Sequence, residues 1–194
     1  MTTIIRPGVR GIVAGLALLL PSLASAQSIA ERARALGTGN LRFSFASRAE
    51  VCGDGHEGNV TIRRGEGRTY MNRNGSGRGE WEADECEPGP VRVSVTLEDG
   101  RPVSLRTYVG GRWRAGGENV VDLGSVSVRE ASDWLLDVAE RGSGKPSSTA
   151  IFAATLADSV TVWPRLMRIA RDEDRPRDTR KQAVFWLSQA AGDA

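Results

Sequence analysis

The residue types best suited to chemistry in this 194-residue chain are its only two cysteines, Cys52 and Cys86, and its only histidine, His56. The cysteines can form a disulfide, or they can join Asp54 and His56 as ligands of a metal ion, because the intervening glycines let a chain turn tightly around an ion. The chain has no C-x-x-C pair and no second histidine. We therefore predict a Cys52–Cys86 disulfide, with His56 as a loop residue.

A disulfide between these cysteines would have a clear physical role. It would close a loop of about 35 residues, which the chain-entropy model values at about 3–4 kcal/mol. The chain between Cys52 and Cys86 is rich in glycine and poor in apolar side chains. Because it has little core of its own, it needs a covalent crosslink to stay folded. The disulfide also requires an oxidising compartment.

The N-terminal residues 1–26 have the pattern of a secretory signal peptide. Arg6 and Arg10 precede an apolar run over residues 11–20 that is too short to span a bilayer, and Ala24-Ser25-Ala26 provides the small residues of a cleavage site. We expect cleavage after this segment and export to the periplasm or the extracellular space, where a disulfide is stable.

The formal net charge of +2 comes entirely from the predicted signal peptide. Without it, residues 27–194 carry 24 basic and 24 acidic side chains. A neutral chain lacks the basic surplus that attracts nucleic acids and anionic membrane surfaces. We therefore expect neither a nucleic acid nor, after signal cleavage, a membrane as a partner.

Other motifs give no catalytic residue, cofactor site or metal site. A single histidine and the absence of G-x-S-x-G argue against a serine hydrolase, and no glycine-rich stretch continues into the Lys-Ser/Thr of a P-loop. The acidic segment 80–87 matches no calcium loop, which favours a solvated loop. Arg112-Trp-Arg114 beside Tyr108 could stack on a nucleic acid or a sugar, but an edge-strand tryptophan that covers the core is the stronger interpretation.

The elements that must position these residues indicate an α+β fold. A short helix over residues 28–36 is predicted from a Ser28 N-cap with Glu31 three residues later. Period-two alternation between residues 40 and 124 predicts an antiparallel unit of about five to seven strands, with short strands expected at residues 60–63, 68–71 and 79–82. Its clearest hairpin joins residues 91–97 to 102–109.

The hydrophobic period changes to 3.6 after Gly124, which predicts helices. We therefore divide the chain into a β-rich domain at residues 27–124 and an α-helical segment at residues 125–194. A linker is expected at residues 142–147. The four expected helices cover residues 127–141, 148–157, 162–170 and 176–189. The first is expected to begin at an N-cap Ser127, with Glu130 completing a capping box.

The last two of these helices form a unit that resembles a HEAT repeat. The positions that fit the family pattern are Asp178, Arg180, Ala183, Leu187 and Gly192-Asp193. Ser188 stands where the family often has glycine, which indicates that the helix continues. The resemblance covers about a fifth of the chain. With the signal peptide, it makes the chain similar to uncharacterised exported bacterial HEAT-repeat proteins, which implies an α-solenoid scaffold role and no catalytic residue.

The last helix carries two large aromatic residues away from its expected apolar face. Helical projection places Ala183 and Leu187 on one face, Phe185 on the opposite face and Trp186 on the flank. A neighbouring unit of a longer repeat array, a second copy of the chain, or packing of Phe185 on the β part would each cover them. We therefore single out Phe185 and Trp186 as a partner surface, with self-association through this helix as one option.

These features lead to hypotheses of different classes. The first is an exported, non-enzymatic scaffold that binds a protein through its HEAT-like helices. The second is a ligand-binding or inhibitor module that uses the Cys52–Cys86 loop. A metal-dependent site around His56 ranks third.

Overall fold

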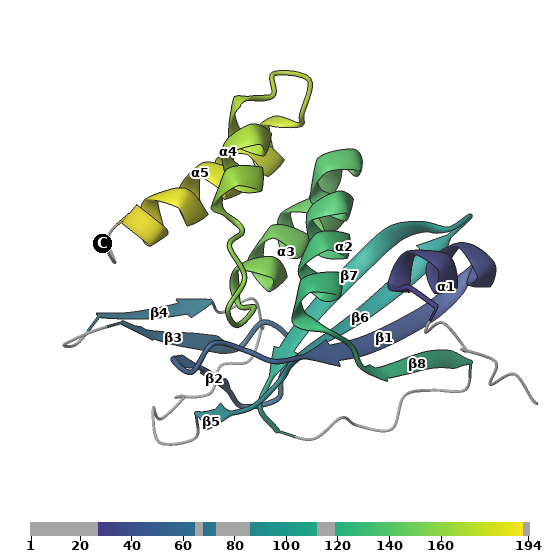
Figure 1. Ribbon diagram of the computed structural model, residues 1–194, viewed down its shortest axis with the longest axis horizontal. Helices are drawn as coiled ribbons and strands as arrows, with labels where there is room; N and C mark the ends of the chain where they lie inside the picture. The colour runs from purple at the N-terminus through teal and green to yellow at the C-terminus, as the bar shows by residue number, and fades with distance from the viewer. Residues whose placement is uncertain (1–26, 65–67, 73–85, 112–118, 192–194) are drawn as a thin grey trace, which may run out of the picture.

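The computed structural model describes residues 27–64, 68–72, 86–111 and 119–191. A short helix comes first, then strands, then four helices (Figure 1), which confirms the α+β class. The strands are β1 (Gly39–Phe45), β2 (Val51–Gly53), β3 (Val60–Arg64), β4 (Arg68–Asn72), β5 (Glu87–Pro88), β6 (Val91–Glu98), β7 (Arg101–Val109) and β8 (Val120–Ser125). The helices are α1 (Ile29–Leu36), α2 (Val128–Arg141), α3 (Gly144–Thr155), α4 (Trp163–Arg171) and α5 (Arg177–Ala191).

The larger sheet has the strand order β7-β6-β1-β8. β6 and β7 form the predicted hairpin, and Asp99 and Gly100 in its turn have the positive φ values of 49° and 71° that a tight hairpin needs. β1 pairs with β6 antiparallel, but β8 runs parallel to β1 at the far edge. The expectation of a purely antiparallel unit is wrong for β8, because the chain crosses from one sheet edge to the other after β7.

The smaller sheet has the order β4-β3-β2-β5 and is formed by the chain between β1 and β6. β3 and β4 confirm the strands expected at residues 60–63 and 68–71. β2 and β5 were not predicted, because strands of three and two residues are too short to show an alternation. The strand expected at residues 79–82 lies outside the described residues.

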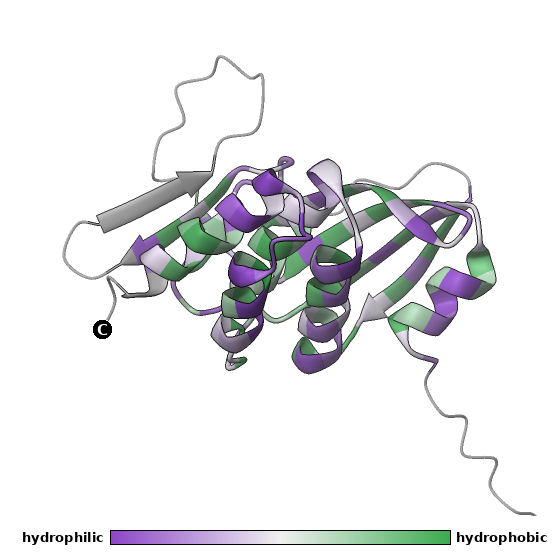
Figure 2. Ribbon diagram, turned by 90° about the horizontal axis from the view of Figure 1, so that it is seen from above, coloured by the Kyte–Doolittle hydropathy of each residue, from purple (hydrophilic) through white to green (hydrophobic). Residues whose placement is uncertain are grey.

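One face of the larger sheet is apolar along its three longest strands. Successive residues of these strands alternate between the two faces, which is visible as green and purple bands in Figure 2. The buried side chains on this face are Leu41, Phe43, Phe45, Val91, Val93, Val95, Leu97, Leu105, Thr107 and Val109. The alternation that predicted these strands therefore also determines which face carries the core.

The helices cover this apolar face from one side (Figure 1). Trp134 of α2 meets Phe43 of β1 edge to face, with ring centroids 5.7 Å apart, and α3 packs on β7. α5 packs in turn on α3 and on α4. The division expected at residues 124 and 125 falls near the end of β8, but one hydrophobic cluster extends from Ile29 to Trp186. The helices and the sheet thus share a core.

The N-caps of α1 and α2 are the predicted serines. Ser28 and Glu31 form the complete capping box of α1. The Ser127 hydroxyl accepts a hydrogen bond from Glu130 N, as an N-cap does. The Glu130 carboxylate accepts a hydrogen bond from Ile29 N at 2.7 Å. It therefore connects α2 to α1 and does not close the predicted capping box. α3 begins at Gly144, inside the expected linker.

Candidate functional site

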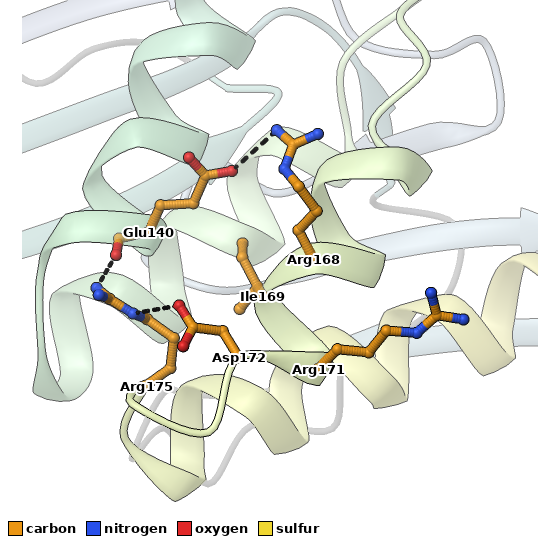
Figure 3. Close-up of a pocket in the computed structure, with 6 residues that line it drawn as sticks. All are labelled: Glu140, Arg168, Ile169, Arg171, Asp172 and Arg175. Atoms are coloured by element: carbon orange, nitrogen blue, oxygen red, sulfur yellow. Dashed lines mark hydrogen bonds and ion pairs between the residues drawn. The ribbon is translucent and has the colours of Figure 1, made fainter.

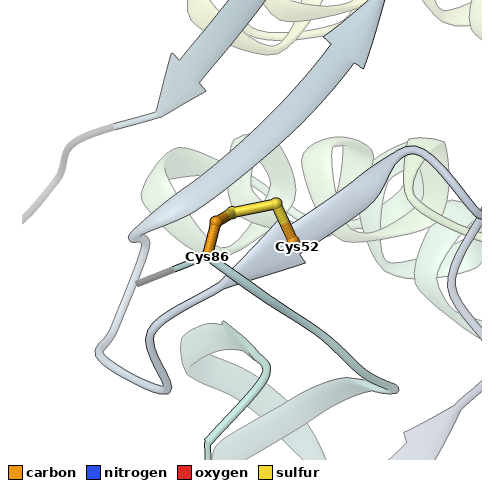
Figure 4. The surroundings of a disulfide bond; sticks show 2 residues. All are labelled: Cys52 and Cys86. Carbon is orange, nitrogen blue, oxygen red and sulfur yellow. A yellow bond between two sulfur atoms is a disulfide. The ribbon is translucent and has the colours of Figure 1, made fainter. Parts of the chain in front are cut away.

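The predicted disulfide between Cys52 and Cys86 is confirmed. The two Cα atoms are 5.2 Å apart, and the bond joins β2 to the residue that precedes β5 (Figure 4). Because the bond uses both sulfur atoms, the alternative metal site with two cysteine ligands is excluded. About half of the loop that the disulfide closes, namely residues 65–67 and 73–85, lies outside the described residues. The role of this loop in binding a ligand therefore stays a prediction.

His56 lies beside Asp54 in the loop after β2. The Asp54 carboxylate accepts hydrogen bonds from His56 N at 2.8 Å and from Asn59 Nδ2 at 2.9 Å. Its Oδ2 atom also lies 3.3 Å from Nδ1 of the His56 imidazole. Burial acts to raise the pKa of Asp54, but these hydrogen bonds and the imidazole outweigh it and hold the pKa below 3.8. The His56 side chain is 63% exposed. Among the described residues, no three metal-ligating side chains gather here or elsewhere.

The same loop rests on the end of β7 through glycine contacts. Gly55 N donates to Val109 O at 2.9 Å. A Cβ atom at Gly53 would lie 2.5 Å from Val109 O, and one at Gly110 would lie 2.6 Å from Glu87 O. Only glycine permits so close an approach of two backbones. These contacts hold the disulfide-bonded segment against the larger sheet.

The residues of α5 that fit the HEAT pattern differ in their burial. Ala183 is buried, Arg180 and Leu187 are partly buried, and Asp178 is exposed in the first turn. The buried face of α5 includes Thr179, Ala183 and Trp186, at the i, i+4 and i+7 positions of a helix stripe. The face therefore differs from the one projected from the sequence, and it contains Trp186.

Trp186 belongs to the core and not to a partner surface. It is 2% exposed and stacks on Phe152 of α3, with ring centroids 5.4 Å apart. The sequence projection could not reveal this, because the covering residue comes from another helix. Phe185 meets Trp186 edge to face at 5.2 Å and keeps 36% of its surface exposed. The predicted partner surface is thus reduced to Phe185, beside Val184, which is 55% exposed.

An ion-pair cluster missed by the sequence analysis joins α2 to α4. Arg165 of α4, whose side chain is only 18% exposed, reaches Asp137 at 2.7 Å, Glu140 at 2.8 Å and Asp133 at 3.6 Å. The three carboxylates stand at i, i+4 and i+7 on one stripe of α2. That spacing was the available signal for an acidic stripe on this helix, but nothing in the sequence indicates which arginine pairs with the stripe.

The cluster borders a surface depression of about 560 Å³ between α2 and α4. Arg168 contacts Glu140 at 3.5 Å, and Arg175 binds both Asp172 and the backbone oxygen of Glu140 (Figure 3). Arg171 extends away from the other side chains. Since arginines occupy the carboxylates, the arrangement is suited to fastening α4 to α2 and offers no free base for catalysis.

We expect Glu140→Gln to lower the free energy of unfolding by about 1–2 kcal/mol at pH 7. Hydrogen bonds from Arg165, which outweigh burial, hold the pKa of Glu140 below its ordinary value of 4.5. The carboxylate therefore contributes stability above pH 4.5, and this contribution is lost as the pH falls through the folded-state pKa. Urea unfolding between pH 3 and pH 7 should show the difference between wild type and variant vanish in acid.

Glu173→Gln is the matched control for this prediction. Glu173 is exposed and forms no ion pair with a described residue, so that its substitution should leave the unfolding free energy unchanged across the same pH range. A Glu140→Gln deficit that persists undiminished in acid would show that the ion pairs are not its cause.

The other predicted segments, namely residues 1–26, 80–85, 112–114 and 192–193, lie outside the described residues. Within the part of the chain that the structure describes, no helix has the length and apolar content required to cross a membrane. Comparisons with protein-family models, with curated proteins and with solved structures each find no match.

Proposed function

We propose that this protein is exported and acts without catalysis, as a scaffold that binds another protein through its HEAT-like helices α4 and α5. The observation that carries the proposal is the position of the large apolar side chains that are exposed to solvent. Of the four such residues among those whose burial the structure describes, Met167, Val184 and Phe185 lie on these two helices. Val184 and Phe185 are adjacent on α5, and neighbouring exposed apolar side chains are typical of interaction surfaces.

Phe185 has the properties of an anchor residue for a protein partner. Its ring lies against the buried Trp186 ring, which restricts its motion before any partner arrives. A side chain that is already ordered loses little entropy on binding, and aromatic anchors of this kind carry much of the affinity of protein interfaces. The exposed neighbours Asp178, Lys181 and Gln182 provide polar groups on the same helix.

Export is supported by two independent features. Residues 1–26 have the pattern of a signal peptide. The Cys52–Cys86 disulfide is of the kind that persists in an oxidising compartment. The partner is therefore expected among periplasmic or secreted proteins.

Affinity capture from a periplasmic extract, followed by calorimetric titration of each captured protein, tests this function. Phe185→Ser should weaken the partner's binding at least tenfold, because an interface anchor contributes more than about 1.4 kcal/mol. Gln182→Ala, also exposed on α5, is the matched control and should leave the affinity unchanged. If Phe185→Ser and wild type bind every captured protein with equal affinity, this surface is not the binding site. If light scattering shows a dimer that depends on Phe185, the partner is a second copy of this chain.

A further inference from the structure

Apart from the depression between α2 and α4, another concave surface is formed by α1, the start of β7, α2, the start of α3 and the two residues that join these last two helices. We name it the α1–α2 groove. Its volume is about 760 Å³, within the range of small-molecule binding sites. Its apolar lining comes from α1, β7, α2 and α3 and includes Ala33, Val103, Trp134, Val138 and Pro146.

Val103 forms an uncovered part of the sheet face that is otherwise buried. Along β7, Leu105, Thr107 and Val109 alternate onto the face covered by the helices, whereas Val103 is 43% exposed. The register between β6 and β7 shifts at this point, with Leu97 opposite Pro102 and Thr96 opposite Ser104. Such a bulge redirects a side chain. It leaves an apolar surface open to solvent where the rest of the strand is packed.

Three arginines line the groove, and two of them, Arg34 and Arg101, come from facing segments and are not paired with the carboxylate of α2. Arg34 is in the last turn of α1 and Arg101 begins β7, and both are exposed without an ion pair to any described residue. The backbones that carry them are fastened together, since Gly100 N donates to Gly37 O at 2.7 Å. A Cβ atom on Gly100 would lie 3.8 Å from the Arg34 Cα atom. The groove thus has two positive charges at the end formed by α1 and the hairpin.

The one carboxylate among the lining residues does not offset these charges. Asp137 is bound by Arg141 and by Arg165, each at 2.7 Å. Glu98 and Asp99 belong to the same hairpin but do not line the groove. The lining therefore combines a largely apolar wall with guanidinium groups that are free to bind an anion, and guanidinium groups match carboxylate oxygens in geometry.

We propose that the α1–α2 groove binds an anionic amphiphile of the medium-chain carboxylate class, with its head group at Arg34 and Arg101 and its chain along Val103, Trp134 and Val138. Charge complementarity selects the anionic head, and the apolar wall, in which Val103 is the exposed residue, selects the chain. An added peptide strand fits less well, because Pro102 and the bulge interrupt the hydrogen-bonding edge of β7. This site is independent of the protein-binding function proposed for α4 and α5.

Isothermal titration with sodium decanoate below its micellar concentration tests the proposal on protein purified from the periplasm of an expressing bacterium. We expect saturable binding of one decanoate per chain. The Arg34→Glu/Arg101→Glu double variant should bind at least tenfold more weakly, and so should Val103→Asp. The matched control is Arg171→Glu/Arg177→Glu, which reverses two exposed arginines outside the groove and should bind like wild type.

Two further titrations distinguish the ligand classes. Decanol has the chain without the carboxylate and should bind at least tenfold more weakly than decanoate. Phe185→Ser should retain full decanoate binding, which separates this site from the surface on α5. No decanoate binding by wild type, or binding that the Arg34→Glu/Arg101→Glu variant leaves unchanged, would overturn the proposal. Arginine-dependent binding of an acidic decapeptide without decanoate binding would overturn it in favour of a polypeptide ligand.

Discussion

Replacing Trp186 by alanine is expected to lower the free energy of unfolding by about 4 kcal/mol, because removal of a large buried aromatic ring leaves a cavity that the surrounding residues fill only in part. Trp186 is 2% exposed and its ring stacks on Phe152, so that the cavity would open between α3 and α5. Urea unfolding followed by circular dichroism measures the change. The melting temperature should fall by about 10 °C.

The adjacent Phe185 is the matched control for the Trp186 substitution. Phe185→Ala removes an aromatic ring from the same helix, but one that is 36% exposed, so that we expect a loss of about 1 kcal/mol. The pair also separates stability from function, since Phe185→Ala should impair partner binding in a folded protein. If Trp186→Ala unfolds at the urea concentration of wild type, the packing of α5 on α3 described above is incorrect.

Replacing Gly110 by alanine is expected to cost about 4 kcal/mol, as the sum of a left-handed backbone strain and a steric overlap with a backbone that cannot move freely. Gly110 has a φ of 66°, and an added Cβ atom would lie 2.6 Å from Glu87 O. Relief of the overlap would require β2 and β5 to separate from the end of β7. Thermal unfolding and the urea midpoint report the loss.

Gly37→Ala isolates the backbone strain in this prediction. Gly37 has the same φ of 66°, but a Cβ atom there would have no neighbour within 4 Å. We therefore expect a cost of about 1 kcal/mol for Gly37→Ala. Equal losses for the two variants would mean that the close approach between Gly110 and the disulfide-bonded segment contributes nothing to stability.

Local features of the sequence were sufficient to predict many of the elements. Ser28 and Ser127 cap helices because an N-cap depends on a few neighbouring residues. The hairpin around Asp99 and Gly100 was predictable because a tight turn needs residues that tolerate positive φ. The Cys52–Cys86 disulfide followed from there being only two cysteines, so that one pairing is available.

The candidate sites depend on contacts that no local pattern contains. The burial of Trp186 depends on Phe152 of another helix, and Arg165 meets three carboxylates of α2. Val103 is exposed at the point where the register between β6 and β7 shifts, which depends on the pairing of two strands.

The sequence by itself determined the α+β class, the disulfide and the order of the longer elements, because periodicity, capping and cysteine number act over short distances or admit one solution. The tertiary structure alone decided which aromatic of α5 is buried, how α4 is fastened to α2, and where the groove beside Arg34 and Arg101 forms. The physical reason is that exposure, ion pairing and concavity are properties of residues brought together from distant parts of the chain.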